Sequence, residues 1–134
     1  GIIWKIARLP VLPADRGLLK LVLTNLVANA IKFTRQRAEA VIEIGCIDNS
    51  ARPDEHLLFV RDNGAGFDMQ YYGKMFGVFQ RLHSAGEFEG TGIGLANCRV
   101  IIERHGGRIW AQGAINAGAT FYFTLPRQVM PERR

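Results

Sequence analysis

Apolar and polar residues recur along the chain with two different periods, and these periods mark the predicted strands and helices. Alternation with a period of two predicts a strand, whereas apolar residues three and four apart predict a helix. The predicted strands cover 1–9, 40–47, 56–62, 108–112 and 119–125, and the predicted helices cover 16–33 and 94–104. In this order the helices can cover only one face of a mixed, mostly antiparallel sheet. The chain is therefore predicted to fold as a two-layer α/β sandwich.

The segment from about 69 to 93 shows neither period and is interrupted by several glycines. A long irregular segment inside a small domain is typical of a lid or a binding loop. We therefore expect one domain over 1–126, with a lid at about 69–93 and a polar C-terminal tail at 127–134.

Three polar side chains interrupt the apolar helix predicted at 16–33. Asn25, Asn29 and Lys32 stand at i, i+4 and i+7 and share one narrow arc of the helix. The same arc continues through Leu18, Leu21 and Val22. An unpaired amide buried on an apolar face costs about 1–3 kcal/mol. A lone asparagine there is more often a satisfied core residue, but three polar groups in one stripe favour a ligand such as a metal ion with a phosphate chain.

A second polar feature follows the strand predicted at 56–62. Asp62 ends this strand and is followed by Asn63-Gly64-Ala65-Gly66. Because glycines carry no side chains, such a turn leaves a carboxylate free to enter a pocket. The carboxylate could then accept a hydrogen bond from an exocyclic amine such as that of adenine. Alone, the same string also fits a solvated turn.

A third feature opens the helix predicted at 94–104. It consists of the glycine-rich run Gly90-Thr91-Gly92-Ile93-Gly94-Leu95. Exposed backbone N–H groups and a helix N-terminus favour phosphate. The run is not a P-loop, because no Lys-Ser/Thr pair follows it. A flexible hinge is the alternative.

In order and spacing, the three features resemble the N box and the two glycine boxes of sensor histidine kinase catalytic domains. These domains belong to the GHKL ATPase/kinase superfamily, which also contains the DNA gyrase B subunit and has the Bergerat-type sandwich with a flexible ATP lid. Residues 76–82 resemble the F box of the kinases, and residues 117–126 resemble their closing strand. The amino-acid sequence of the predicted lid is most similar to that of phytochrome-type kinases. The resemblance covers nearly the whole chain, from about Leu9 to Pro126.

The resemblance implies roles at the phosphate end of a bound ATP. Asn29 would coordinate a Mg²⁺ ion that bridges the phosphates, with Asn25 helping, and Lys32 would neutralise a phosphate. The residues that would wrap the phosphates are Gly90, Thr91, Gly92, Gly94 and Leu95. Phe76 and Phe79 would hold the lid or face partner helices, and Arg81 would touch the γ-phosphate or the partner.

The resemblance also implies roles at the adenine end. Asp62 would bind the adenine amine, supported by Thr120 directly or through water. Phe33 would pack near the base. Gly64 and Gly66 would let the nucleotide approach.

One position separates kinases from hydrolases in this superfamily. The hydrolysing members carry a glutamate one turn before the metal-binding asparagine, where it acts as general base. Asn25 occupies that position and cannot take up a proton at neutral pH, which favours a kinase. His56, His83 and His105 lack the following acid that a phosphoacceptor histidine typically has. The acceptor is therefore expected on a separate helical dimerisation and phosphoacceptor domain, with a response regulator receiver domain downstream.

Three other functions remain open from the sequence. An anti-sigma-factor kinase has the same fold and phosphorylates serine, although the segment resembling an F box speaks against it. A nucleotide-binding interaction module would lack transferase activity. A nucleic-acid binder is weakly supported, because the net charge of +5 is scattered along the chain rather than clustered with aromatic residues.

Composition adds an expectation about the compartment. The chain has 134 residues and no apolar run near the roughly 18–20 residues needed to cross a bilayer. Its start lacks the layout of a signal peptide. Cys46 and Cys98 have no metal-type spacing, which favours reduced, structural cysteines. We therefore expect a cytoplasmic domain without direct membrane contact, in a parent protein that is either soluble or membrane-anchored.

Overall fold

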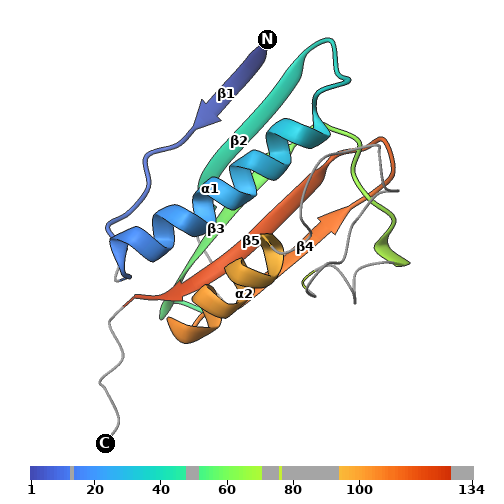
Figure 1. Cartoon of the computed structure of the whole chain (residues 1–134). Helices are drawn as coiled ribbons and strands as arrows, with labels where there is room; N and C mark the ends of the chain where they lie inside the picture. Colours follow the sequence, from blue (N-terminus) through green and yellow to red (C-terminus); the bar gives the residue numbers. More distant parts are fainter. Residues whose placement is uncertain (13, 48–51, 71–75, 77–93, 128–134) are drawn as a thin grey trace, which may run out of the picture.

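A five-stranded sheet with two helices on one face forms the molecule (Figure 1). The computed structural model describes residues 1–12, 14–47, 52–70, 76 and 94–127. The elements are β1 (Ile2–Ile6), α1 (Arg16–Phe33), β2 (Ala40–Ile47), β3 (Glu55–Asp62), α2 (Gly94–Arg104), β4 (Ile109–Gly113) and β5 (Ala119–Pro126). The strand order is β1-β2-β3-β5-β4, with β1 parallel to β2 and all other neighbours antiparallel. The predicted two-layer α/β sandwich is confirmed.

The predicted elements match closely, except at the end of the first strand. That strand was expected to reach Leu9 but ends at Ile6. The backbone N–H of Ala7 still donates to Ile44 at 2.9 Å, and the chain then leaves the sheet for α1. The predicted lid lies outside the described residues apart from 69, 70 and 76, and so does the predicted tail apart from Arg127.

Local hydrogen bonds fix both ends of α1. The side chain of Asp15 accepts a hydrogen bond from the backbone N–H of Leu18 at 3.0 Å, as an N-cap does. At the other end, the hydroxyl of Thr34 donates to the carbonyl oxygen of Ala30 at 2.8 Å. Because both ends are capped, the polar residues of α1 stand at fixed positions above the sheet.

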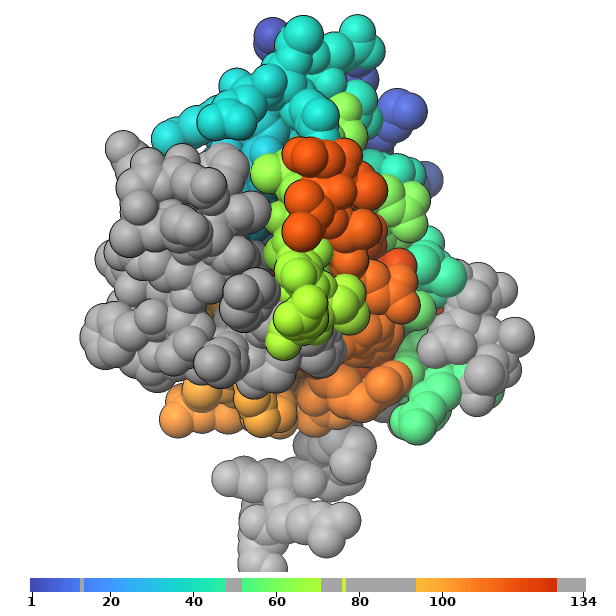
Figure 2. Space-filling model, turned by 90° about the vertical axis from the view of Figure 1, so that its right-hand side faces the viewer, coloured from blue at the N-terminus to red at the C-terminus, as the bar shows by residue number. Residues whose placement is uncertain are grey.

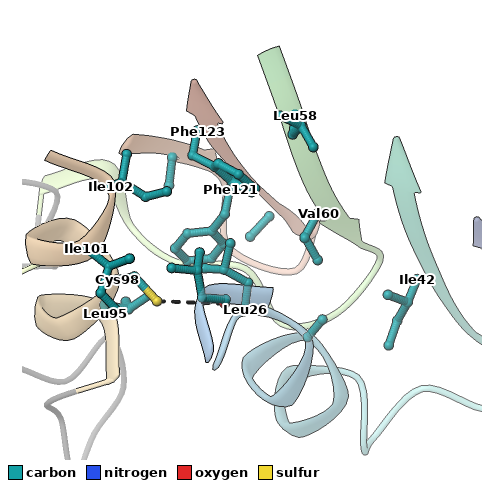
Figure 3. Packing of buried hydrophobic residues seen from close by; sticks show 14 of the residues in the cluster. Leu26, Ile42, Leu58, Val60, Leu95, Cys98, Ile101, Ile102, Phe121 and Phe123 are labelled. Carbon is teal, nitrogen blue, oxygen red and sulfur yellow. Dashed lines mark hydrogen bonds between the residues drawn. The ribbon is translucent and has the colours of Figure 1, made fainter. Parts of the chain in front are cut away.

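The core lies between the sheet and the two helices (Figure 3). Leu26 of α1 and Phe121 and Phe123 of β5 are at most 2% exposed. The core also contains the following residues of α2: Leu95, Cys98, Ile101 and Ile102. Burying one large apolar side chain contributes about 1.5–3 kcal/mol, so this layer dominates the stability. α1 thereby packs against β3, α2 packs against β4 and β5, and the two helices pack against each other.

Candidate functional site

The polar arc of α1 lies at the boundary between core and surface. Asn25, Asn29 and Lys32 are all half-buried. The same arc was expected to continue through Leu18, Leu21 and Val22 as the apolar side of a core helix. That expectation is confirmed at Val22, which is 0% exposed, and wrong at Leu18 and Leu21, which are 37% and 45% exposed. The position at the boundary leaves the three polar groups accessible to a ligand that approaches from solvent.

The C-terminal end of α1 is joined directly to the turn after β3. The backbone N–H of Ala65 donates to the carbonyl oxygen of Phe33 at 2.9 Å. A Cβ on Gly64 would overlap the same carbonyl, so only glycine permits this approach. Phe33 follows Asn29 by about one helical turn. The junction therefore brings the turn after Asp62 next to the last turn of α1, which carries Asn29 and Lys32.

Asp62 presents a buried carboxylate beside this junction. It is 5% exposed, and its Oδ1 accepts a hydrogen bond from the backbone N–H of Gly64 at 2.8 Å. Burial raises the pKa of Asp62 to about 6, although hydrogen bonds from the backbone N–H groups of Gly64 and Ala119 and the charge of Arg37 oppose the rise. The carboxylate is thus mostly ionised at neutral pH, because its pKa lies only slightly below 7. An ionised carboxylate can only accept hydrogen bonds, which suits a ligand amine.

The β4–β5 hairpin closes against the turn after β3. Asn116 donates its backbone N–H to the carbonyl oxygen of Ala65 at 2.7 Å. Gly66 has a φ of +65°, and a Cβ there would overlap the carbonyl oxygen of Ala114. Figure 2 shows the yellow-green residues of this turn in contact with the orange-red hairpin. The packing of the hairpin against this turn therefore requires a glycine at position 66, independently of any bound nucleotide.

Two residues that the sequence analysis missed hold these turns together. The guanidinium of Arg37 donates to the carbonyl oxygens of Asn63, Gly64 and Asn116 at 2.7, 2.9 and 2.9 Å. The side chain of Asn63 accepts a hydrogen bond from the N–H of Val41 at 2.8 Å and donates to the carbonyl oxygen of Glu39 at 2.9 Å. No sequence signal marks Arg37, which stands in a polar connector like many surface arginines.

The first residues of α2 lie beside Asn25. A Cβ built on Gly94 would lie 3.4 Å from Oδ1 of Asn25, which is ordinary contact distance. Leu95, which was predicted to wrap phosphate, is 9% exposed and belongs to the core. The predicted ligands Gly90, Thr91 and Gly92 lie outside the described residues, as do Phe79, Arg81 and His83.

Cys98 of α2 contacts the polar arc of α1 from the buried side. Its thiol donates to the carbonyl oxygen of Val22 at 3.8 Å and also bonds the side chain of Asn25. Burial raises the pKa of Cys98 to about 11, so the thiol stays neutral. Cys46 and Cys98 are both free, and the expected structural role is confirmed for Cys98.

The structure does not bring Thr120 to the carboxylate of Asp62. Thr120 pairs with Arg61 across the strands and accepts a hydrogen bond from its Nε at 3.3 Å on the exposed side. Asp62 pairs instead with Ala119. Because neighbouring residues of a strand point to opposite faces, the hydroxyl of Thr120 lies on the face away from Asp62. The predicted direct support by Thr120 is therefore wrong, and the residue opposite Asp62 is Ala119.

Two other predicted residues have clear structural partners. The Nε2 of His105 accepts a hydrogen bond from the backbone N–H of Asp15 at 3.1 Å, and its Nδ1 lies 2.8 Å from the carbonyl oxygen of Ile101. His105 therefore has a structural role, between the start of α1 and the end of α2. Phe76, the one residue of the predicted F box among the described residues, packs edge-on against Phe121, with ring centroids 6.5 Å apart.

The side chains of the polar arc could hold a metal ion only if other ligands complete its coordination shell. In the part of the chain that the structure describes, no group of three or more His, Cys, Asp or Glu side chains stands ready to hold a metal. The carboxamide oxygens of Asn25 and Asn29 are hard donors of the kind that Mg²⁺ accepts, but two are too few for its octahedral shell. The arc thus suits a magnesium ion that arrives with phosphate oxygens and water.

Comparison with known proteins identifies the family. Residues 14–129 match the family described as "Histidine kinase-, DNA gyrase B-, and HSP90-like ATPase". The chain belongs to this family. Its membership confirms the predicted histidine kinase-type ATP-binding catalytic domain and implies that the domain uses a nucleotide.

Individual relatives agree with this assignment. The chain is 48% identical to cyanobacterial phytochrome A of Nostoc sp. over 88% of its own length, but spans 15% of that relative. The catalytic domain of the histidine kinase ThkA is 31% identical, with a TM-score of 0.74 over 95% of this chain and 80% of that one. Full-length ShkA in complex with AMPPNP is 27% identical, with a TM-score of 0.73 over 98% of this chain and 26% of that one. The predicted likeness to phytochrome-type kinases is confirmed.

The comparisons also bear on what surrounds the domain. The chain spans about 15% of the curated phytochrome it matches, so this relative carries further domains. Neither α1 nor α2, the two helices of the described part, is long and apolar enough to span a lipid bilayer.

Proposed function

We propose that this domain binds Mg²⁺-ATP and transfers the γ-phosphoryl group to a histidine on a separate dimerisation and phosphoacceptor domain of the same kinase. A response regulator receiver domain would accept the phosphoryl group downstream. The reaction would take place in the cytoplasm. The bond between the γ-phosphorus and the β–γ bridging oxygen breaks, and a bond from the γ-phosphorus to an imidazole nitrogen forms.

One observation carries the proposal, namely the junction between the end of α1 and the turn after Asp62. It joins the turn after a buried carboxylate, suited to the adenine amine, to Phe33. Phe33 directly follows Lys32 and stands about one helical turn after Asn29, and these two residues suit phosphates and their metal. A nucleotide has these two chemistries at its two ends. The complex of the related ShkA with AMPPNP supports the same reading.

The residues of the domain would act mainly by positioning and charge neutralisation. Asp62 fixes the base, while Asn25, Asn29 and Lys32 orient the phosphates. Bound Mg²⁺ would supply neutralisation of the charge that develops on the transferred group. Holding the reacting atoms in line lowers the barrier without any covalent step on the domain itself.

The side chain of Asn25 supports transfer over hydrolysis. A carboxamide cannot act as general base, and its neighbours in the structure are the thiol of Cys98 and the first residue of α2. No group at this position would activate water. ATP would therefore persist until the histidine of the partner domain arrives.

A two-stage experiment tests the proposal. Isothermal titration should first show Mg²⁺-dependent binding of ATP, and its absence would remove the basis of the kinase assignment. Incubation with radiolabelled ATP and the histidine-bearing domain of the parent kinase should then give acid-labile, base-stable label on that domain. Acid-stable label would indicate serine phosphorylation instead, and binding without any label would indicate an interaction module. Asn29→Ala should lose the label, whereas Thr120→Ala, altered on the opposite face of the sheet, should keep it.

A further inference from the structure

The guanidinium of Arg37 makes three hydrogen bonds, and the proposed function does not yet use it. It is half-buried in the connector between α1 and β2. Its guanidinium donates to three carbonyl oxygens on two other turns, those of Asn63, Gly64 and Asn116. Arginine suits such a position, because its planar fork is permanently charged and directs several donors at once. One side chain thus joins the end of α1, the turn after β3 and the β4–β5 hairpin.

A single peptide unit connects Arg37 to Asp62. Nε of Arg37 donates to the carbonyl oxygen of Asn63 at 2.7 Å. The N–H of the same peptide unit is that of Gly64, and it donates to Oδ1 of Asp62 at 2.8 Å. The guanidinium therefore holds the negative end of the peptide dipole and turns its positive end toward the carboxylate. Hydrogen bonds linked in this way polarise and strengthen one another.

We propose that Arg37 is a positioning residue for base recognition, which acts through the Asn63–Gly64 peptide to hold the Asp62 carboxylate oriented and ionised for the adenine amine. This inference rests on the proposed function for its ligand. Its physical core, the coupling of Arg37 to Asp62, concerns the nucleotide-free protein and can be measured there.

The other charges around Asp62 do not replace this effect. Charged side chains at the ends of the adjoining elements that meet at this junction are Lys32 on α1, Arg35, Arg37 and Glu39 in the connector, Arg61 on β3 and Asp68 after its turn. Arg16 and Lys20 of α1 and Glu55 of β3 stand toward the other ends of their elements. The hairpin residues 114–118 carry no charge. Arg61 points to the opposite face, where it pairs with Glu43 and Thr120. Arg37 is the cation whose charge lowers the pKa of Asp62 against the effect of burial.

Carboxyl NMR titration of the nucleotide-free domain tests the coupling, with Asp62→Asn assigning the signal. In wild type the Asp62 carboxyl should titrate near pH 6, and the amide proton of Gly64 should shift with the same midpoint. Arg37→Met, which keeps an apolar stem, should raise the pKa of Asp62, while Arg37→Lys, which keeps the charge but not the fork, should raise it less. The matched control Arg104→Met removes an exposed arginine of α2 and should leave it unchanged.

ATP titrations on the same variants supply the functional arm. Arg37→Met should weaken ATP binding at neutral pH by about fivefold or more, because a charge-assisted hydrogen bond that orders the base-binding group is lost. The pH at which ATP affinity is half-maximal should rise together with the pKa of Asp62. Arg37→Lys should recover part of both effects.

The outcomes separate this inference from the proposed function. If a folded Arg37→Met leaves the pKa of Asp62 and the Gly64 amide shift unchanged, Arg37 is merely structural and the inference is refuted. If Arg37→Met does not fold, the wild type supplies the test. The inference is then refuted if the chemical shift of the Gly64 amide proton does not change as Asp62 titrates. If the pKa of Asp62 rises as expected but wild type binds no ATP, the coupling stands and the proposed function fails.

Discussion

Asp62→Asn is expected to stabilise the nucleotide-free domain at neutral pH while weakening its recognition of adenine. The pKa of Asp62 rises from 3.8 to about 6 on folding, mainly because burial disfavours the charged form. One pKa unit corresponds to about 1.4 kcal/mol, so keeping this carboxylate ionised in the folded state costs on the order of 3 kcal/mol. Asparagine retains an oxygen that can accept the hydrogen bond from Gly64 without carrying that charge.

The sign of the pH dependence follows from proton binding. Between pH 3.8 and about 6 the folded state binds more protons at Asp62 than the unfolded state does. The free energy of unfolding of wild type therefore falls, relative to Asp62→Asn, as the pH rises through this window. The difference should reach its full size, on the order of 3 kcal/mol, above the pKa of the folded state and vanish below that of the unfolded state.

Urea unfolding at a series of pH values, followed by tryptophan fluorescence or circular dichroism, measures this difference directly. Taking the difference between wild type and variant cancels the titration of all other groups. Asp54→Asn removes an exposed carboxylate and serves as the matched control. A wild type-minus-variant difference that stays constant across the window, or that changes with the opposite sign, would refute the account of Asp62 as a buried and strained charge.

Three further substitutions test separate parts of the site. Asn29→Ala should abolish phosphoryl transfer in the radiolabel assay but reduce ATP affinity much less, and undiminished transfer would contradict its metal role. Gly64→Ala should destabilise the domain by about 2 kcal/mol or more in urea unfolding, because the added Cβ would overlap the carbonyl of Phe33. A urea midpoint equal to that of wild type would contradict this, since it would mean that the junction accommodates the methyl group. Thr120→Ala should leave the ATP dissociation constant within about twofold by titration, since its hydroxyl faces Arg61, and a larger loss would restore Thr120 to the site.

The fold could be predicted from the sequence because its local signals agree with one another. The helix α1 begins and ends where Asp15 and Thr34 cap it, and the apolar spacing of Val22, Leu26 and Ala30 matches its buried face. β2 and β5 begin with the alternating burial of half-buried strands, whereas residues 56–60 of β3 are all buried. The entry of the Asp62 carboxylate into a buried position could also be predicted, because glycines in the following turn leave it room, although the same string also fits a solvated turn.

The contacts that shape the site could not be read in the same way. The guanidinium of Arg37 donates to backbone carbonyls on turns that are distant in sequence. Because every residue has a backbone carbonyl, no residue type at a fixed spacing predicts these contacts. The error at Thr120 arose because moving one residue along a strand turns the side chain to the other face. The exposure of Leu18 and Leu21 could not be predicted either, because helical periodicity does not specify how far along α1 the packing extends.

A crystal structure of the domain with Mg²⁺ and a non-hydrolysable ATP analogue would show whether one nucleotide joins Asp62 to Asn29. We expect the adenine amine to donate a hydrogen bond to Asp62 and Asn29 to contact the metal bound to the phosphates of the same molecule. A nucleotide whose base lies away from Asp62, or whose phosphates lie away from Asn29, would contradict it.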